Sequence, residues 1–146
     1  MKDLSRAKHC LGLRIHQLEG KITLDQENYL NDVLTKFNMS ECKTVKTPMQ
    51  PSFNFSSNED DTQDMKNIPY REAIGSLQFL ASITRPDIAY AVNKLSQFCS
   101  SPNKSHWTAV KHLMRYLKGT KQYKLEYVKG QPSEIVAYCD ADWAGD

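Results

Sequence analysis

Long apolar runs are missing from this sequence of 146 residues. No stretch approaches the roughly 18–20 consecutive apolar residues that a membrane-spanning helix requires. The first eight residues are mostly polar or charged and have no apolar stretch behind them, so the sequence carries no recognisable secretory signal. We therefore expect an intracellular protein, in the cytoplasm, a virus-like particle or the nucleus, with no membrane partner.

Cysteine and histidine are sparse and scattered. The four cysteines lie far apart, form no Cys-x-x-Cys pair, and are accompanied by four histidines that lack the spacing of a zinc set. This pattern excludes a metal site built from sulfur and imidazole ligands. Isolated cysteines without a secretory signal are typical of free thiols in a reducing compartment.

Charge is unevenly distributed along the chain. Residues 52–66 carry four acids against one lysine, whereas residues 104–129 carry seven bases against Glu126. A basic segment flanked by acidic ones indicates a polyanionic partner held by one lobe. The other interpretation is a solvated helix face that keeps the protein soluble, and charge alone leaves both open.

The first third of the sequence predicts a β-hairpin and a helix. Apolar residues alternate over residues 10–25, and Gly20 supplies a turn between the two strands. Asp25 is the expected N-cap of a helix that runs to about Asn38. We expect residues 43–51 to be extended, and residues 52–67, rich in Ser, Asn and Asp, to form an exposed loop.

Three helices and two strands are predicted after this loop. The helices cover residues 70–84, 86–100 and 104–118, with Gly119 as the C-cap of the third. Residues 121–129 alternate as a strand, and a turn at residues 130–133 leads to a final strand that carries Ile135, Val136 and Tyr138 and continues to its acidic end. The fold class is therefore α+β: a β-hairpin, a helical bundle and two C-terminal strands.

The third helix gathers its bases on one side. At 100° per residue, four basic side chains fall within about 60° of arc, opposite an apolar face that includes Trp107, which we expect to anchor the core. These four residues are Lys104, Lys111, Arg115 and Lys118.

The last strand points carboxylates toward one face. Alternation with a period of two places Tyr138, Asp140 and Asp142 on the same side. Carboxylates at the end of an apolar strand can hold Mg²⁺, which prefers oxygen ligands. Alternation does not choose between the two acids, and a solvated strand end is the plainer interpretation.

Five segments in this order resemble the copia-type retrotransposon polyprotein, at the junction of its reverse transcriptase and ribonuclease H. The resemblance covers essentially the whole chain and is weakest over residues 52–67. The segments are Leu11-Gly-Leu-Arg-Ile15, Tyr70-Arg-Glu-Ala-Ile-Gly-Ser-Leu-Gln-Phe-Leu80, Thr84-Arg-Pro-Asp-Ile88, Leu113-Met-Arg-Tyr-Leu-Lys-Gly-Thr120 and Tyr138-Cys-Asp-Ala-Asp-Trp-Ala-Gly-Asp146.

The resemblance implies a division of the chain into four parts. Residues 1–51 look like the primer-grip hairpin and a first thumb helix, and residues 52–69 like an acidic flexible loop. Residues 70–120 look like the helical thumb and connection. Residues 121–146 look like a connection strand and the first strand of ribonuclease H, in which Asp140 matches the first catalytic aspartate and a Mg²⁺ ligand.

The resemblance also implies a function. The parent protein would copy RNA into DNA and cleave the RNA of the hybrid, with the rest of the polyprotein as partner. Here Lys104, Lys111, Arg115, Lys118 and Lys121 would contact the phosphates of the RNA/DNA template–primer duplex. The Tyr-x-Asp-Asp turn would precede Met1 and further acids would follow Asp146, so we expect these residues to be inert alone. The alternatives are a non-catalytic nucleic-acid-binding module derived from such an element and a decayed copy without function.

Overall fold

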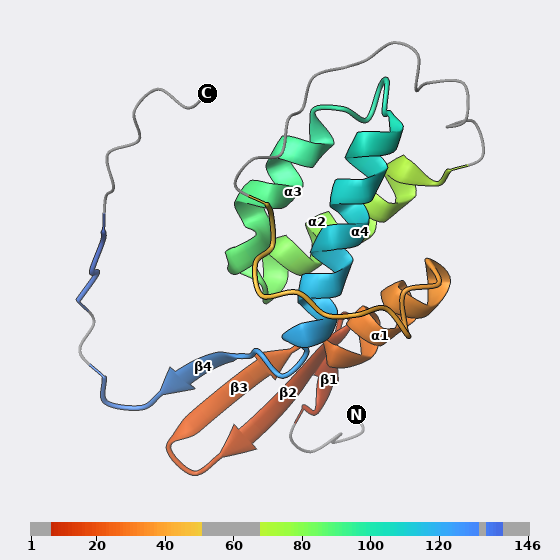
Figure 1. Ribbon diagram of the computed structural model, residues 1–146. Coiled ribbons are helices and arrows are strands. Elements are labelled where there is room, and N and C mark those ends of the chain that lie inside the picture. Colours follow the sequence, from red (N-terminus) through yellow and green to blue (C-terminus); the bar gives the residue numbers. More distant parts are fainter. Residues whose placement is uncertain (1–6, 51–67, 132–133, 139–146) are drawn as a thin grey trace.

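The computed structural model describes residues 7–50, 68–131 and 134–138. A small sheet lies at one end of a group of helices (Figure 1). The order of elements within the described residues is β1, β2, β3, α1, α2, η3, α3, α4 and β4. The expected α+β class is confirmed. The predicted acidic loop at residues 52–67 lies outside the described residues.

The predicted N-terminal hairpin is confirmed. Strands β2 (Leu13–Leu18) and β3 (Lys21–Asp25) pair antiparallel. At the turn between them Gly20 has a φ of 76°, which a glycine adopts without steric cost. A short strand that the sequence did not predict, β1 (His9–Cys10), pairs with β2 through a second tight turn at Leu11 and Gly12. Both turn residues have positive φ, the geometry that suits a two-residue hairpin loop.

The fourth strand comes from the far end of the described chain. Strand β4 (Leu125–Val128) pairs antiparallel with β3, giving the order β1-β2-β3-β4. This strand was predicted as residues 121–129, but its partner was not. Of the second predicted C-terminal strand, only residues 134–138 are described: they pair with no described strand and Ile135 is 96% exposed, and the rest of the predicted strand lies outside the described residues. Strand-forming residues make a strand only where a neighbouring backbone accepts their hydrogen bonds.

The helices agree with their predicted ranges and differ at their ends. Helices α1 (Glu27–Lys36), α2 (Tyr70–Ile83) and α4 (Lys104–Gly119) are each a single helix. The predicted helix at residues 86–100 instead begins with one 3₁₀ turn, η3 (Pro86–Ile88), and continues as the shorter α3 (Ala89–Ser96). A proline at the first position suits such a turn, since the ring fixes φ and its missing N–H is not needed there.

Two predicted caps were wrong. Gln26, and not Asp25, occupies the N-cap position of α1, because Asp25 is still paired in β3. Thr120 is the C-cap of α4, and Gly119 is the last helical residue. Helix α4 begins with a reciprocal cap that the sequence analysis missed: Asn103 Oδ1 accepts from the backbone N–H of His106, whose Nδ1 accepts from the N–H of Asn103.

The hydrophobic core lies among the helices. Its buried apolar residues come from α1, α2, η3, α3 and α4, and Trp107 packs against them edge-on to Phe37, as expected of a core anchor. The buried Tyr70 hydroxyl donates to the carbonyl of Leu95, which joins α2 to α3. None of the described residues of the four strands belongs to this core.

The segment after α1 crosses α4. Residues 43–50, predicted to be extended, are without regular structure and bend at residues 46–49, and they run along the outside of α4 in Figure 1. Among the described cysteines, Cys10, Cys42 and Cys99 are free, in agreement with the sequence. No described helix is both long and apolar enough to cross a membrane.

Candidate functional site

The predicted basic residues lie along α4 and just beyond its end. Lys104 is exposed on the first turn, whereas Lys111, Arg115, Lys118 and Lys121 are each partly buried. Within the described residues, no hydrogen bond or ion pair of the Lys104 or Lys111 ammonium group is found, although the Lys104 carbonyl accepts from the Thr108 hydroxyl. We call these five residues, four on α4 and one just after it, the α4 basic surface (Lys104, Lys111, Arg115, Lys118 and Lys121).

Three of these side chains hold other parts of the chain. Arg115 Nε donates to the carbonyl of Lys43 at 2.7 Å, and Lys118 Nζ donates to that of Cys42 at 2.8 Å. Lys121 Nζ donates to Asn31 Oδ1 at 2.6 Å. The α4 basic surface thus has a structural role that sequence reasoning missed. A guanidinium has five N–H donors and an ammonium three, so these contacts leave donors for a phosphate.

The crossing segment adds positive charge of its own. Lys43 and Lys46 are exposed. They lie close to α4, because Arg115 and Lys118 bind the backbone carbonyls of residues 43 and 42. His112 Nε2 contacts the carbonyl of Thr47 at 2.9 Å. These two lysines were not predicted as site residues. The sequence did offer a signal, because lysines in an extended segment can bind the same polyanion as the bases of a helix.

A hollow of about 290 Å³ adjoins the α4 basic surface. Its walls are apolar on one side, where Met39, Pro48 and Met49 lie, and basic on the other. The basic wall is formed by α4 side chains, namely Lys111, His112 and Arg115.

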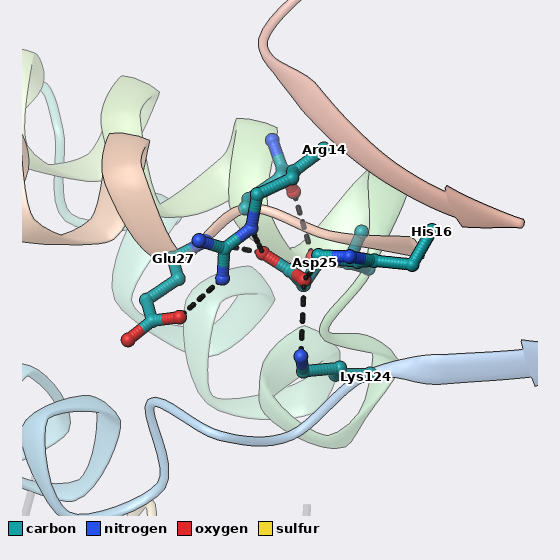
Figure 2. Close-up of polar contacts among 7 residues, drawn as sticks. Arg14, His16, Asp25, Glu27 and Lys124 are labelled. Carbon is teal, nitrogen blue, oxygen red and sulfur yellow. Dashed lines mark hydrogen bonds and ion pairs between the residues drawn. The ribbon is translucent and has the colours of Figure 1, made fainter. Parts of the chain in front are cut away.

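A second polar group surrounds the carboxylate of Asp25 (Figure 2). Asp25 is fully buried and accepts from Arg14 Nε at 2.9 Å and from the backbone N–H of Glu27 at 3.2 Å. His16 Nε2 lies 3.1 Å and Lys124 Nζ 3.5 Å from its other oxygen. Arg14 also pairs with Glu27. The group links β2, β3, α1 and the residue preceding β4.

The environment of Asp25 favours its charged form. Burial opposes ionisation, but the N–H of Glu27 and the guanidinium of Arg14 outweigh it and hold the pKa of Asp25 below its ordinary value. A depressed pKa in the folded state means that stability is present above the unfolded-state pKa and is lost as the pH falls through the folded one.

We expect the free energy of unfolding to fall as the pH is lowered from about 5 to below 4, where unfolded aspartates take up protons. Urea unfolding followed by circular dichroism at a series of pH values measures this slope. In Asp25→Asn the slope should be shallower and the protein less stable at neutral pH. An identical slope in Asp25→Asn would mean that other carboxyl groups carry the acid sensitivity.

A third polar group is built from the Thr84-Arg-Pro-Asp-Ile88 segment. Arg85 is 3% exposed and pairs with Asp87 at 2.8 and 2.9 Å. It also donates to the backbone carbonyl and the hydroxyl of Thr120 at 3.1 and 2.6 Å. Its guanidinium lies 5.6 Å from the ring centroid of Tyr116 and 5.3 Å from that of Tyr123.

This group fixes the α2–η3 junction against the end of α4. The Tyr116 hydroxyl donates to Asp87 at 2.8 Å, and the Thr84 hydroxyl donates to Gln26 Oε1 at 2.8 Å. Burial opposes ionisation of Asp87, but its bonds to Arg85 and Tyr116 lower its pKa overall. The Thr84–Ile88 segment, one of the five that carry the resemblance, therefore has a structural role in joining these helices.

The structure does not bring together a metal centre within the residues it describes. No group of three or more His, Cys, Asp or Glu side chains in the described ranges could hold a metal ion. Asp140, the predicted catalytic residue and Mg²⁺ ligand, lies outside those ranges, as does Asp142. The assignment of Asp140 remains a prediction.

Comparison with known proteins gives consistent results over the whole chain. The family described as reverse transcriptase (RNA-dependent DNA polymerase) matches residues 1–51. The retrovirus-related Pol polyprotein from transposon TNT 1-94 of Nicotiana tabacum is 40% identical over 100% of the chain and 11% of its own length. The corresponding polyprotein from transposon RE1 of Arabidopsis thaliana is 42% identical over 100% of the chain and 10% of its own length.

A shorter relative covers nearly the same range. An uncharacterized mitochondrial protein of Arabidopsis thaliana is 34% identical over 99% of the chain and 59% of its own length. No solved structure matches. The chain spans about a tenth of the length of the Pol polyproteins named above. In sequence, the chain is therefore similar over its whole length to a segment of retrotransposon Pol polyproteins, and its residues 1–51 match the reverse transcriptase family.

Proposed function

We propose that this segment holds the template–primer duplex in a copia-type reverse transcriptase and leads into its ribonuclease H. The observation that carries the proposal is the α4 basic surface, which lies in the same chain as residues 1–51, the part that matches the reverse transcriptase family. On this proposal, β2 and β3 support the primer end, and the helices hold the duplex. The chain would act within the longer polyprotein, with Mg²⁺ supplied at sites to which Asp140 contributes.

The chemistry of the α4 basic surface supports contact with phosphate rather than with bases. Lysine and arginine side chains on the outside of a helix neutralise backbone charge and carry no sequence information by themselves. Lys43 and Lys46 extend the same surface across α4. Binding should therefore be indifferent to sequence and should weaken steeply with salt, because each phosphate contact releases counterions.

Lys104 and Lys111 give the cleanest test, because neither holds another described part of the chain. Each phosphate contact contributes about 0.9 to the slope of log K against log salt on a B-form duplex. Replacing Lys104 and Lys111 with Gln should reduce that slope by up to about 1.8. Fluorescence anisotropy of a labelled RNA/DNA hybrid, titrated at several salt concentrations, measures it.

The matched control removes two charges elsewhere. Lys36 pairs with Glu72 at the surface, and Lys94 lies on α3 next to Tyr90. Replacing both with Gln should leave the slope unchanged if the α4 basic surface is the binding face. Equal reductions in the two double variants would show only a general charge effect. If neither double variant reduces the slope, the basic residues of α4 form a solvated helix face and not a binding face.

The non-catalytic alternative predicts the same binding and differs in context. A binding module derived from a transposon would use the α4 basic surface without a polymerase. The distinguishing measurement is primer extension by a longer polypeptide that includes the reverse transcriptase residues preceding this segment. If the α4 substitutions weaken primer extension in proportion to hybrid binding, the surface serves the polymerase.

A further inference from the structure

Tyr123 presents one side of its ring to solvent. The Arg85 guanidinium lies over the ring, 5.3 Å from its centroid, yet Tyr123 is 50% exposed. Arg85 itself is buried, and its guanidinium also lies over the ring of the buried Tyr116. Because a buried group covers one side of the Tyr123 ring, the exposed surface lies on its other side and at its edge. The ring therefore has one face packed on a buried cation and one face open to a ligand.

The turn after α4 fixes the position of this ring. The backbone N–H of Tyr123 donates to the carbonyl of Thr120 at 3.1 Å. Arg85 donates to the same carbonyl at 3.1 Å and to the Thr120 hydroxyl at 2.6 Å. The backbone of Tyr123 and the cation against its ring thus share one anchor. A ring held in this way loses little conformational freedom when a ligand stacks on it, which favours binding.

A hollow of about 500 Å³ adjoins the Tyr123 ring. Ligand pockets usually measure roughly 300–1,000 Å³, so the hollow is large enough for a nucleotide. The charged side chains in its lining are balanced, two of each sign, and the amide of Gln122 lies among them. These charged residues are Arg85, Asp87, Lys124 and Glu126. Balanced charge and many hydrogen-bonding groups suit a polar, uncharged planar group such as a nucleobase better than an anion.

The α4 basic surface extends to this ring. Lys121, its last member, lines a small cavity together with Tyr123 and Arg85. Lys121 Nζ donates to Asn31 Oδ1, and an ammonium group has three donors, so donors remain for a phosphate. A nucleotide whose phosphate contacted Lys121 would have its base within reach of Tyr123, because only one sugar separates the two groups.

We propose that Tyr123 is a stacking platform for an unpaired base next to the duplex that the α4 basic surface holds. The inference rests on the proposed function and adds to it a contact with the single-stranded continuation of the template. Bases inside a duplex stack on one another, whereas an unpaired base offers its face to an aromatic side chain. Such stacking accepts any base and neutralises no phosphate. Its contribution to affinity should therefore be independent of salt.

Binding to two RNA/DNA hybrids tests the proposal in the 146-residue chain. One hybrid is blunt, and the other carries a short single-stranded extension. Tyr123→Leu should weaken binding to the extended hybrid about tenfold and leave the blunt hybrid nearly unaffected, in fluorescence anisotropy titrations. The slope of log K against log salt should not change. Tyr123→Phe keeps the ring and should bind both hybrids as the unaltered chain does.

Tyr90 provides the matched control. It is 64% exposed on α3, and Lys94 Nζ lies 6.0 Å from its ring centroid. Tyr90→Leu should leave both affinities unchanged. Equal weakening by the two leucine variants would overturn the proposal, as would a Tyr123→Leu effect of the same size on both hybrids. If the unaltered chain binds neither hybrid in a salt-dependent way, the proposed function fails and this inference fails with it.

Photocrosslinking tests the contact on unaltered side chains and does not depend on the folding of a variant. The extension carries 5-bromouracil, which on irradiation reacts with an aromatic ring stacked on it. Mass spectrometry should locate the crosslink at Tyr123. Crosslinks found only at other residues, with the salt slope of the unaltered chain retained, would show that the unpaired strand follows another path. That result would refute the stacking role of Tyr123 and leave the proposed function in place.

Discussion

Replacing Arg85 with Met is expected to lower the free energy of unfolding by about 3 kcal/mol, the lower end of the range for breaking a buried ion pair. The change removes the partner of Asp87 and the donors to Thr120, and methionine restores only part of the volume between Tyr116 and Tyr123. The lower end applies because the Asp87 side chain is 32% exposed and water can solvate part of it. Urea unfolding at neutral pH measures the loss.

Arg71 provides the matched control. It is exposed and donates one hydrogen bond to the carbonyl of Cys99. Arg71→Met should cost no more than about 0.5 kcal/mol, as is usual for surface changes. If the two variants lose the same stability, the Arg85 group does not hold the end of α4 in the way that its contacts indicate.

Asp140→Asn is expected to abolish cleavage of hybrid RNA in a longer Pol polypeptide that includes the remaining ribonuclease H residues. The expectation rests on the resemblance, in which Asp140 is a Mg²⁺ ligand, and a two-metal site fails when a bridging or terminal carboxylate is lost. DNA synthesis by the same polypeptide should be largely retained, because on the resemblance its metal ligands would lie in the residues that precede this segment. Gel assays of RNA cleavage and primer extension on one hybrid substrate measure both.

Asp142→Asn distinguishes the two acids that strand alternation places on one face. It should reduce RNA cleavage much less than Asp140→Asn. Equal losses from the two changes, or full activity in Asp140→Asn, would mean that the Mg²⁺ ligand has been assigned to the wrong residue.

The local parts of the fold could be read from the sequence, and the long-range parts could not. The alternation in residues 13–25 and the apolar stripes of α2 and α4 report on neighbours a few residues away, which fix a strand or a helix. The pairing of β4 with β3 depends on residues about a hundred positions apart. Neither strand has a sequence feature that identifies the other as its partner, so both strands were predicted but their pairing was not. The predicted final strand is described only at residues 134–138, which pair with no described strand.

The candidate site shows a similar limit. Helical geometry predicts that Lys104, Lys111, Arg115 and Lys118 share one side of α4, and all four lie within that helix. It gave no sign that Arg115 and Lys118 bind the backbone of residues 43 and 42, since backbone acceptors leave no mark in a sequence. The buried role of Asp25 was likewise hidden, because an aspartate before a helix is more often an exposed cap.

The pairing of β4 with β3 limits which segments could be exchanged between related polyproteins without dividing the sheet. Residues 1–51 match a known family, but β3 lies between β2 and a strand at residues 125–128. A recombination or fusion joint placed between residues 51 and 125 would therefore divide one sheet between two parents. If the new β4 failed to pair, β3 would become a bare edge strand, which invites pairing with other chains. Exchange between related elements should thus be tolerated at joints outside residues 9–128 and selected against within them.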